Sequence, residues 1–221
     1  MPVNARHRRA DDRERRIGDV AETVSPPTTM LVAGTVDPSE YALGLRLLAH
    51  AGGSDDTAIV VTTTEGREEA VAHTQDVETA NGVPSLAVVD TVSEDQYLTA
   101  PYADVPTVYM PSPDDLERLV IALSDLTATV APSTGTQHFV VQSLTPMIEG
   151  ATTRRVCRLL EQLRGLRVGD GLGIFGIDFT AHDEETVSQL TAVVDCLLWV
   201  SEDTDGRLQF ELRNTSHRLD Y

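Results

Sequence analysis

The chain of 221 residues contains no lysine: all 17 basic residues are arginine, against 35 acidic residues, for a formal net charge of −18. Carboxylates stay solvated in concentrated salt, and molar salt shortens the screening length to about 3 Å, which largely removes their mutual repulsion. We therefore expect a halophilic protein. The alternative is an ordinary acidic mesophilic protein, since a GC-rich genome also favours arginine. The charge opposes general nucleic-acid binding, which needs several cations on one face.

Cysteine is also scarce. Cys157 and Cys196 lie in apolar segments without C-x-x-C spacing or a neighbouring histidine pair, so the sequence predicts no zinc site and two buried thiols in a reducing cytoplasm. No apolar run approaches the length of about 18 residues that a membrane span needs, and the N-terminus lacks the apolar core of a signal peptide. We expect a soluble cytoplasmic protein without metal or cofactor.

Residues 1–27 are the only basic stretch of the chain. They have no aromatic residue and end in two prolines, which predicts a disordered Arg-rich tail followed by one domain over residues 28–221. The tail is a candidate docking element for an acidic protein, for nucleic acid or for the acidic face of a second copy; the other reading is a solvated leader without a role. Its arginines are Arg6, Arg8, Arg9, Arg13, Arg15 and Arg16.

From residue 28 onward, apolar runs alternate with helical patterns. The runs are typical of buried parallel strands and lie at 29–33, 57–63, 85–90, 137–144, 171–177 and 196–200. The helical patterns lie at 38–51, 66–75, 113–129, 150–165 and 182–193. Residues 206–213 alternate apolar with polar side chains, as an antiparallel edge strand does. This order predicts an α/β fold of three layers, with a mainly parallel central sheet and a C-terminal antiparallel edge hairpin.

The first strand, turn and helix stand where a nucleotide-binding protein carries its phosphate loop, yet the phosphate-binding residues are absent. The motif G-x-x-x-x-G-K-[ST] uses glycines for close backbone approach, lysine for the phosphate charge and a hydroxyl for Mg²⁺. Here Gly34 remains, but Ser39 stands at the second glycine, Glu40 at the lysine and Tyr41 at the hydroxyl. At an effective dielectric of about 20, two charges about 4 Å apart interact by roughly 4 kcal/mol, so exchanging lysine for glutamate costs about twice that.

Asp37 and Asp178 fit structural roles, and Asp195 lies away from the usual ligand site. Asp37 precedes Pro38, a proline without an N–H to offer an anion, and the pair is typical of a helix start. Asp178 follows a strand, where aspartate is a common turn former. Asp195 lies where a strand begins, the end opposite to the usual ligand crevice of an α/β sheet. Because the phosphate-binding residues are absent, we expect no ATP binding and a simple strand, loop and helix at 29–51.

The order of these segments resembles the KaiC/RecA-like ATPase superfamily, and most closely its degenerate haloarchaeal members, the KaiC-like and HTR-like proteins that lack the phosphate-loop lysine. The resemblance covers residues 28–214 and includes the opening strand, loop and helix. It also rests on four segments: TAIVVTTTEGREE, HFVVQSLTP, LGIFGID and TVSQLTAVVDCLLWVSEDTDGRLQFELRN.

The resemblance implies a RecA-like (P-loop NTPase-like) domain with broken catalytic motifs. The Mg²⁺-holding aspartate falls on Gln142, a poor ligand for a hard dication. The water-activating acid falls on Thr64 or Glu65, of which Glu65 alone has a carboxylate. Without lysine and aspartate, phosphoryl transfer has neither charge clamp nor metal holder. What the resemblance implies is a pseudo-ATPase with no catalytic residue.

Three hypotheses follow. The first is a regulatory or protein-binding module that pairs with a protein partner or with itself. The second is a weak nucleotide binder or ATPase that uses ATP and Mg²⁺ at a rebuilt site, with Arg67, Arg154 or Arg155 in place of the lysine. The third is a signalling or transcription-control adaptor that docks through the Arg-rich tail. We favour the first.

Overall fold

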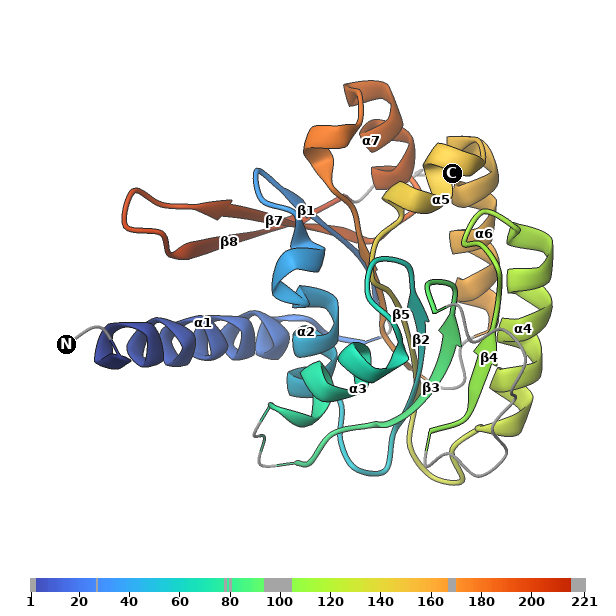
Figure 1. The fold of residues 1–221 in the computed structure, drawn as a ribbon, viewed down its shortest axis with the longest axis horizontal. Coiled ribbons are helices and arrows are strands. Elements are labelled where there is room, and N and C mark those ends of the chain that lie inside the picture. Colours follow the sequence, from blue (N-terminus) through green and yellow to red (C-terminus); the bar gives the residue numbers. More distant parts are fainter. Residues whose placement is uncertain are drawn as a thin grey trace, which may run out of the picture.

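The computed structural model describes residues 3–26, 28–77, 79, 81–93, 105–166 and 170–215, with side chains from residue 12 onward. These segments form an α/β fold of three layers (Figure 1). The predicted fold class is confirmed: a mostly parallel central sheet has helices on both faces, and an antiparallel hairpin ends it.

The central sheet has eight strands within the described residues, in the order β4-β3-β2-β5-β6-β1-β7-β8. All neighbours are parallel except β7 and β8, the predicted hairpin. The strands are β1 (Thr29–Gly34), β2 (Thr57–Thr62), β3 (Ser85–Asp90), β4 (Thr107–Tyr109), β5 (Gln137–Val141), β6 (Gly173–Gly176), β7 (Cys196–Glu202) and β8 (Leu208–Asn214).

The helices cover the two faces of the sheet in separate groups. Helices α1 (Val3–Thr23), α2 (Leu43–Ala51) and α3 (Arg67–Gln75) share one hydrophobic core with the sheet, and α4 (Leu116–Thr129), α6 (Thr153–Leu166) and α7 (Glu184–Thr191) share the other (Figure 1). A short helix, α5 (Thr145–Gly150), precedes α6, and two 3-10 turns are η1 (Pro38–Tyr41) and η2 (Phe179–Ala181).

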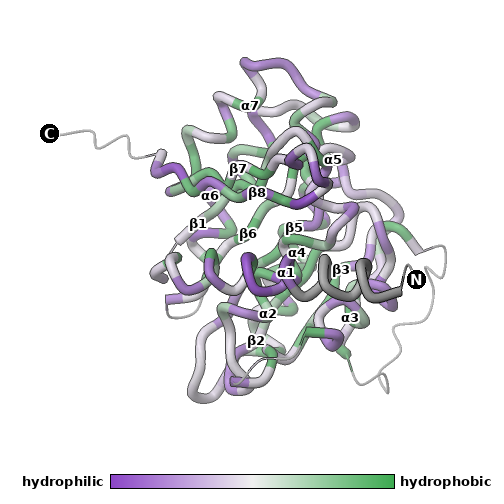
Figure 2. The backbone as a smooth tube through the Cα atoms, turned by 90° about the vertical axis from the view of Figure 1, so that its left-hand side faces the viewer, coloured by the Kyte–Doolittle hydropathy of each residue, from purple (hydrophilic) through white to green (hydrophobic). Residues whose placement is uncertain are grey.

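Helix α1 lies in the segment that the sequence predicts to be disordered, so that prediction was wrong for this stretch. Its C-terminal half carries an apolar stripe at helical spacing: Ile17 is fully buried, Ala21 is buried, and Val20 packs beside them, as does Val24 directly after the helix. Burial of that stripe against α2 and the hairpin outweighs the arginine-rich composition. Figure 2 looks onto the side of the molecule from which α1 and the β7–β8 hairpin project.

Polar contacts also hold α1 against its neighbours. The Glu14 carboxylate forms an ion pair with Arg46 of α2 and lies 3.2 Å from His50 Nε2 in the same helix. Arg16 donates a hydrogen bond to the carbonyl oxygen of Leu208 in β8 (3.1 Å). Three elements distant in the sequence therefore meet along α1.

The cysteines differ from each other. Cys196 is buried at the start of β7, as predicted, and burial together with the nearby Asp195 raises its pKa to about 11. Cys157 is only half-buried, and its thiol donates to the carbonyl oxygen of Gln189 (3.6 Å). Both are free thiols. Of the helices in the described segments, none has the length and apolarity to cross a membrane.

Candidate functional site

The neighbouring strands β1 and β6 are followed by connections that run in opposite directions along the sheet. From β1 the chain passes through α2, on one face, to β2; from β6 it passes through α7, on the other face, to β7. In open α/β sheets, ligands bind in the crevice that such a reversal opens beyond the carboxyl ends of the strands. The residues after β1, β2, β5 and β6 therefore form the candidate site.

The structure brings the predicted positions together at this end of the sheet. Ser39 and Pro38 from the loop after β1, Glu65 from the loop after β2 and Gln142 from the end of β5 line one cavity, with Ala42, Leu43, Gly44 and Leu45. Its volume is about 10 Å³, about the room that one water molecule requires. A cavity of this size does not have the room for a triphosphate.

The loop after β1 bonds to its own residues and to the neighbouring strand β7. Thr35 N–H donates to the carbonyl oxygen of Val200 (2.9 Å), and Asp37 accepts hydrogen bonds from the N–H (2.9 Å) and the hydroxyl (2.8 Å) of Ser39. Glu40 N–H donates to the Asp37 carbonyl oxygen (3.3 Å). Asp37 is thus the cap of η1, as the sequence predicts. These N–H groups point to protein acceptors and not toward an anion.

Gly34 is the one phosphate-loop glycine that the sequence retains, and packing explains it. A Cβ at this position would overlap the carbonyl oxygen of Val200 in the adjacent β7. Glycine is required here because two strands approach closely, with no need for a bound phosphate.

Tyr41 and Glu40 stand where the hydroxyl and lysine of a phosphate loop would be. The guanidinium of Arg13 in α1 lies 5.7 Å from the centre of the Tyr41 ring, within cation–π range. Arg46 Nε donates to the Tyr41 carbonyl oxygen (3.2 Å). Tyr41 is therefore part of the contact between α1 and α2, while the Glu40 side chain is exposed.

Gln142 ties the end of β5 to the loop after β2. Its Oε1 atom accepts hydrogen bonds from the N–H groups of Thr63 (3.0 Å), Thr64 (3.3 Å) and Glu65 (3.3 Å). Thr63 and Ser143 add a reciprocal pair, in which the threonine hydroxyl donates to the Ser143 carbonyl oxygen (2.8 Å) and accepts from its N–H (2.9 Å). At the position of a metal-holding aspartate, the amide therefore has a structural role.

Glu65 and the next strand end have partners as well. Glu65 Oε2 lies 3.0 Å from Nε2 of His73 in α3. Asp90, at the end of β3, is fully buried and accepts from the N–H groups of Arg67 (2.9 Å) and Ser93 (3.0 Å). Burial alone would raise the pKa of Asp90, but hydrogen bonds from Ser93, Val92 and Arg67 outweigh it and lower the pKa below that of an ordinary aspartate.

Sequence reasoning missed Asp90. The available signal was a carboxylate directly after the apolar run SLAVV, because the end of this strand lies beside the end of the neighbouring strand β2, from which α3 follows. In the structure it fixes the start of α3 and the turn after β3. Within the described residues, no group of three or more histidine, cysteine, aspartate or glutamate side chains is arranged to hold a metal ion.

The arginines of the rebuilt-site hypothesis do not line the cavity beside Gln142. Arg155 pairs with Glu117 (3.5 Å) and lines a separate cavity of about 330 Å³ between α4 and α6. Arg154 precedes it in α6 and is exposed. Arg67 opens α3, and its Nε atom is buried without a hydrogen-bond partner among the described residues.

Asp178 and Asp195 have the structural surroundings that their positions predict. Asp178 caps η2 through Thr180, whose N–H lies 2.9 Å from the carboxylate. Asp195 lies at the amino end of β7, where it accepts from the N–H (2.8 Å) and hydroxyl (2.6 Å) of Thr29.

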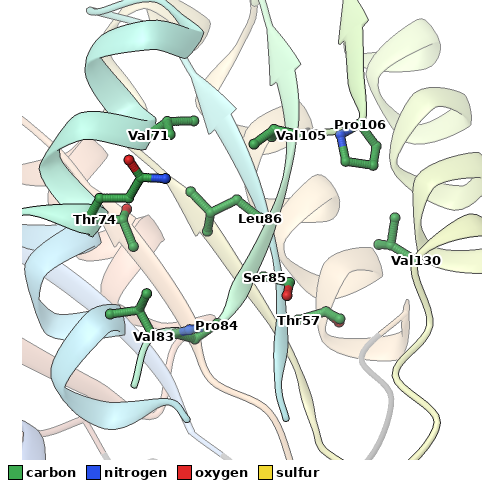
Figure 3. A pocket seen from close by; sticks show the side chains of 11 residues that line it. Thr57, Val71, Thr74, Val83, Pro84, Ser85, Leu86, Val105, Pro106 and Val130 are labelled. Carbon is green, nitrogen blue, oxygen red and sulfur yellow. The ribbon is translucent and has the colours of Figure 1, made fainter. Parts of the chain in front are cut away.

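A larger cavity, of about 360 Å³, lies at the amino ends of β2 and β3 (Figure 3). Valine, leucine and proline side chains form most of its wall, with Thr57, Thr74 and Ser85 as the hydroxyl groups. The Thr57 hydroxyl is buried and lacks a hydrogen-bond partner in the part of the chain that the structure describes. This cavity is at the end of the sheet opposite to the predicted phosphate loop, so it contributes nothing to that site.

Comparison with known proteins gives a family and a fold. The model of "Family of unknown function (DUF7504)" matches residues 27–199. The curated proteins contain no match. Among solved structures, the uncharacterized protein PH0321 from Pyrococcus horikoshii, crystallised in complex with an unknown peptide, is similar with a TM-score of 0.58 and 14% sequence identity. The likeness covers 90% of this chain and 88% of that one, and it shows a shared fold.

Proposed function

The chain belongs to the DUF7504 family, and we propose that it is a protein-binding, regulatory module of KaiC/RecA-like type that neither binds nor hydrolyses ATP. One observation carries the proposal. The cavity beside Pro38, Ser39, Glu65 and Gln142 has a volume of about 10 Å³, and N–H groups of Ser39 and Thr63 beside it donate to protein oxygens.

The charges near this cavity support the same function. Glu40 and Glu65 would repel a polyphosphate, and Gln142 brings no charge to hold Mg²⁺. Opening the site would also break the bonds of Gln142 to the loop after β2. Phosphate binding would therefore cost both electrostatic and structural free energy.

A role in binding protein is supported by the neighbour of similar fold. PH0321 was crystallised in complex with an unknown peptide, and we propose peptide or protein recognition for this chain too. From the acidic, lysine-free composition we further propose that it works in the salt-rich cytoplasm of a halophile.

Thermal unfolding in molar KCl, with and without saturating Mg-ATP, tests the proposal. A ligand at about 100 times its Kd would add about 2.7 kcal/mol to the free energy of unfolding and visibly raise the midpoint. We expect no shift for the natural protein. Glu40→Lys serves as a matched variant: we expect no shift for it either, because the cavity is closed as well as acidic. A clear shift of the natural protein contradicts the proposal.

The same experiment decides on the rebuilt nucleotide site. If Mg-ATP stabilises the natural protein and Arg67→Ala or Arg154→Ala abolishes the effect, the chain is a nucleotide binder and the closed cavity opens in solution. The described residues do not favour that function at present, since no arginine lines the cavity beside Gln142 and Arg155 pairs with Glu117.

Deleting residues 1–27 is not a clean test of the hypothesis that the chain is an adaptor docking through its Arg-rich segment. Removing residues 1–27 would uncover the surfaces on which Ile17 and Ala21 are buried. Substituting the exposed Arg15 by glutamate changes the charge of α1 and leaves its buried stripe intact. Loss of partner capture by Arg15→Glu would support docking through α1.

A further inference from the structure

Strand β8 forms one edge of the sheet, and its outward main-chain groups can be assigned. Successive residues of an antiparallel strand direct their N–H and C=O groups alternately to one neighbour and to the other side. Arg207 accepts from Asp203 N–H (2.9 Å), and Thr215 N–H donates to Asp195 (3.1 Å), so odd-numbered residues bond toward β7. The even-numbered residues of β8 therefore direct their main-chain groups outward.

Helix α1 covers only the beginning of this edge by hydrogen bonding. The outward carbonyl oxygen of Leu208 accepts from Arg16 (3.1 Å). Within the described part of the chain, no hydrogen bond from outside the hairpin reaches the main chain of Phe210, Leu212 or Asn214. Leu212 is 37% exposed although it is an apolar residue inside a strand. The unpaired main-chain groups along such an edge can form hydrogen bonds with a strand of another chain.

We propose that this edge binds the same edge of a second copy, with the two β8 strands antiparallel about a two-fold axis at Leu212. The two leucines then face each other, and Phe210 of each copy faces Asn214 of the other. Every outward N–H and C=O group of these three residues gains a partner. The sheets of the two copies become continuous through this pair of strands.

The charges of β8 fit this register. Glu211 of one copy stands opposite Arg213 of the other, twice by symmetry, in the pair type that brings side chains closest. A shift of two residues in one direction would place Glu211 opposite Glu211 of the other copy. The same shift in the other direction would place Arg213 opposite Arg213. A shift by one residue would set outward groups against inward ones. Among registers within two residues of this one, it is therefore the one that is self-complementary in both charge and hydrogen bonding.

The two charged side chains already lie together on one face of β8. Arg213 is 2.6 Å from the Glu211 carboxylate, and its guanidinium lies 5.5 Å from the centre of the Trp199 ring in β7. In the dimer, two such pairs meet across the axis and form a network of four charges.

The net charge makes the dimer salt-dependent. Each copy has a formal charge of −18, so two copies repel each other in dilute buffer, and salt screens that repulsion. We expect the Kd of the dimer to fall as KCl rises to molar concentration. The inference names a second copy as partner and thereby rests on the proposed protein-binding function, but its test does not involve nucleotide.

Sedimentation equilibrium in molar KCl tests the pairing through charge exchange. We expect the natural protein to dimerise, and Glu211→Arg and Arg213→Glu each to raise the Kd about tenfold or more, because each creates two like-charge pairs across the axis. A mixture of the two variants should form heterodimers, since every opposed pair is then attractive. Dimers of equal strength in either variant alone, or a mixture that stays monomeric, would overturn the proposal.

Two further variants address the main chain. Leu212→Pro removes an outward N–H that β7 does not use, so we expect a protein that is folded by circular dichroism and monomeric by sedimentation. Leu212→Thr keeps the N–H and should retain most of the dimer. Leu212→Cys should form a disulfide between copies under mild oxidation, and Gln209→Cys should not, since that position is distant from the axis.

The possible failures are distinct. If the natural protein sediments as a monomer in molar KCl and Mg-ATP leaves its unfolding unchanged, the dimer is wrong and the proposed function stands. If it dimerises through β8 but Mg-ATP stabilises it, the pairing stands and the proposed function is wrong.

Discussion

The polar side chains at the carboxyl end of the sheet bond to each other instead of facing an empty site. Gln142 accepts hydrogen bonds from three N–H groups of the loop after β2. Asp37 accepts one from the N–H of Ser39, and Asp90 accepts one from the N–H at the start of α3. Buried polar groups that are satisfied in this way rigidify their surroundings. At the residue scale, these side chains stabilise the loops at this end of the sheet.

Gln142→Ala should therefore reduce stability. It leaves the N–H groups of Thr63, Thr64 and Glu65 without their acceptor, and we expect a loss of about 2 to 4 kcal/mol in the free energy of unfolding. Gln142→Glu keeps an acceptor oxygen of the same reach and should lose less than half as much at neutral pH. Chemical denaturation in molar KCl measures both. Equal losses would show that the acceptor atom is not the cause.

Gly34→Ala separates packing from phosphate binding. The added methyl group overlaps the Val200 carbonyl oxygen, so we expect a loss of about 3 kcal/mol or more, or failure to fold. A methyl group at Gly165 in α6 would meet no other part of the described chain within 4 Å, and Gly165→Ala should stabilise the protein by about 0.4 to 1 kcal/mol. Thermal unfolding compares the two. A stable Gly34→Ala protein would contradict the close strand contact.

Part of this site could be predicted from sequence. The positions of Ser39, Glu65 and Gln142 meet because carboxyl ends of parallel strands lie at one edge, and each residue follows a recognisable apolar run. The role of Gly34 was not predictable, because the atom that excludes a side chain belongs to Val200, far along the chain. The acceptor role of Gln142 likewise depends on the path of a loop from another strand.

Among the elements, α1 departs most from the sequence-based expectation. Arginines dominate its composition, and the apolar stripe of Ile17, Val20 and Ala21 occupies only its C-terminal part. The helix gains stability from α2, from the Glu14 ion pair with Arg46 and from β8. These partners are tertiary, and composition alone contains no information on them.

Ile17→Ala tests whether α1 is packed in solution. Ile17 is fully buried, so we expect a loss of about 2 to 4 kcal/mol in the free energy of unfolding. Arg15→Ala, an exposed position of the same helix, should change it by less than about 0.5 kcal/mol. Urea unfolding in molar KCl is a suitable measurement. If the two variants are equally stable, residues 1–27 are disordered as their composition suggests.

The strands were the most predictable elements. Runs such as 57–63 and 85–90 correspond to β2 and β3 because strands buried on both faces are apolar throughout. The edge hairpin of β7 and β8 followed from alternation. Strand β4 has only three residues, Thr107–Tyr109, and α5 has six, Thr145–Gly150. Such short elements lack a periodic signal.

The charge of the whole molecule sets the conditions under which it is stable. Acidic residues outnumber arginines by about two to one, and the formal charge is −18. Their repulsion destabilises the compact state at low ionic strength, and screening by salt relieves it. The proposal that the protein is halophilic rests on this screening of repulsion by salt.

Raising KCl from dilute to molar concentration should increase stability by about 2 kcal/mol or more, equivalent to about 4 to 8 °C in Tm. A variant with Asp125→Asn and Glu161→Gln, both exposed in helices, should have a smaller salt dependence because it has fewer repelling charges. Calorimetric scans at several KCl concentrations measure this. A flat dependence for the natural protein would favour the mesophilic alternative.

The central proposal is that the small cavity beside Gln142 binds no nucleotide, and calorimetric titration of Mg-ATP into the natural protein in molar KCl tests it most directly. We predict heats equal to those of dilution at every step, with Ser39→Gly/Glu40→Lys as a variant that restores two phosphate-loop residues for comparison. A saturable binding curve for the natural protein, with one nucleotide per chain, would contradict the account.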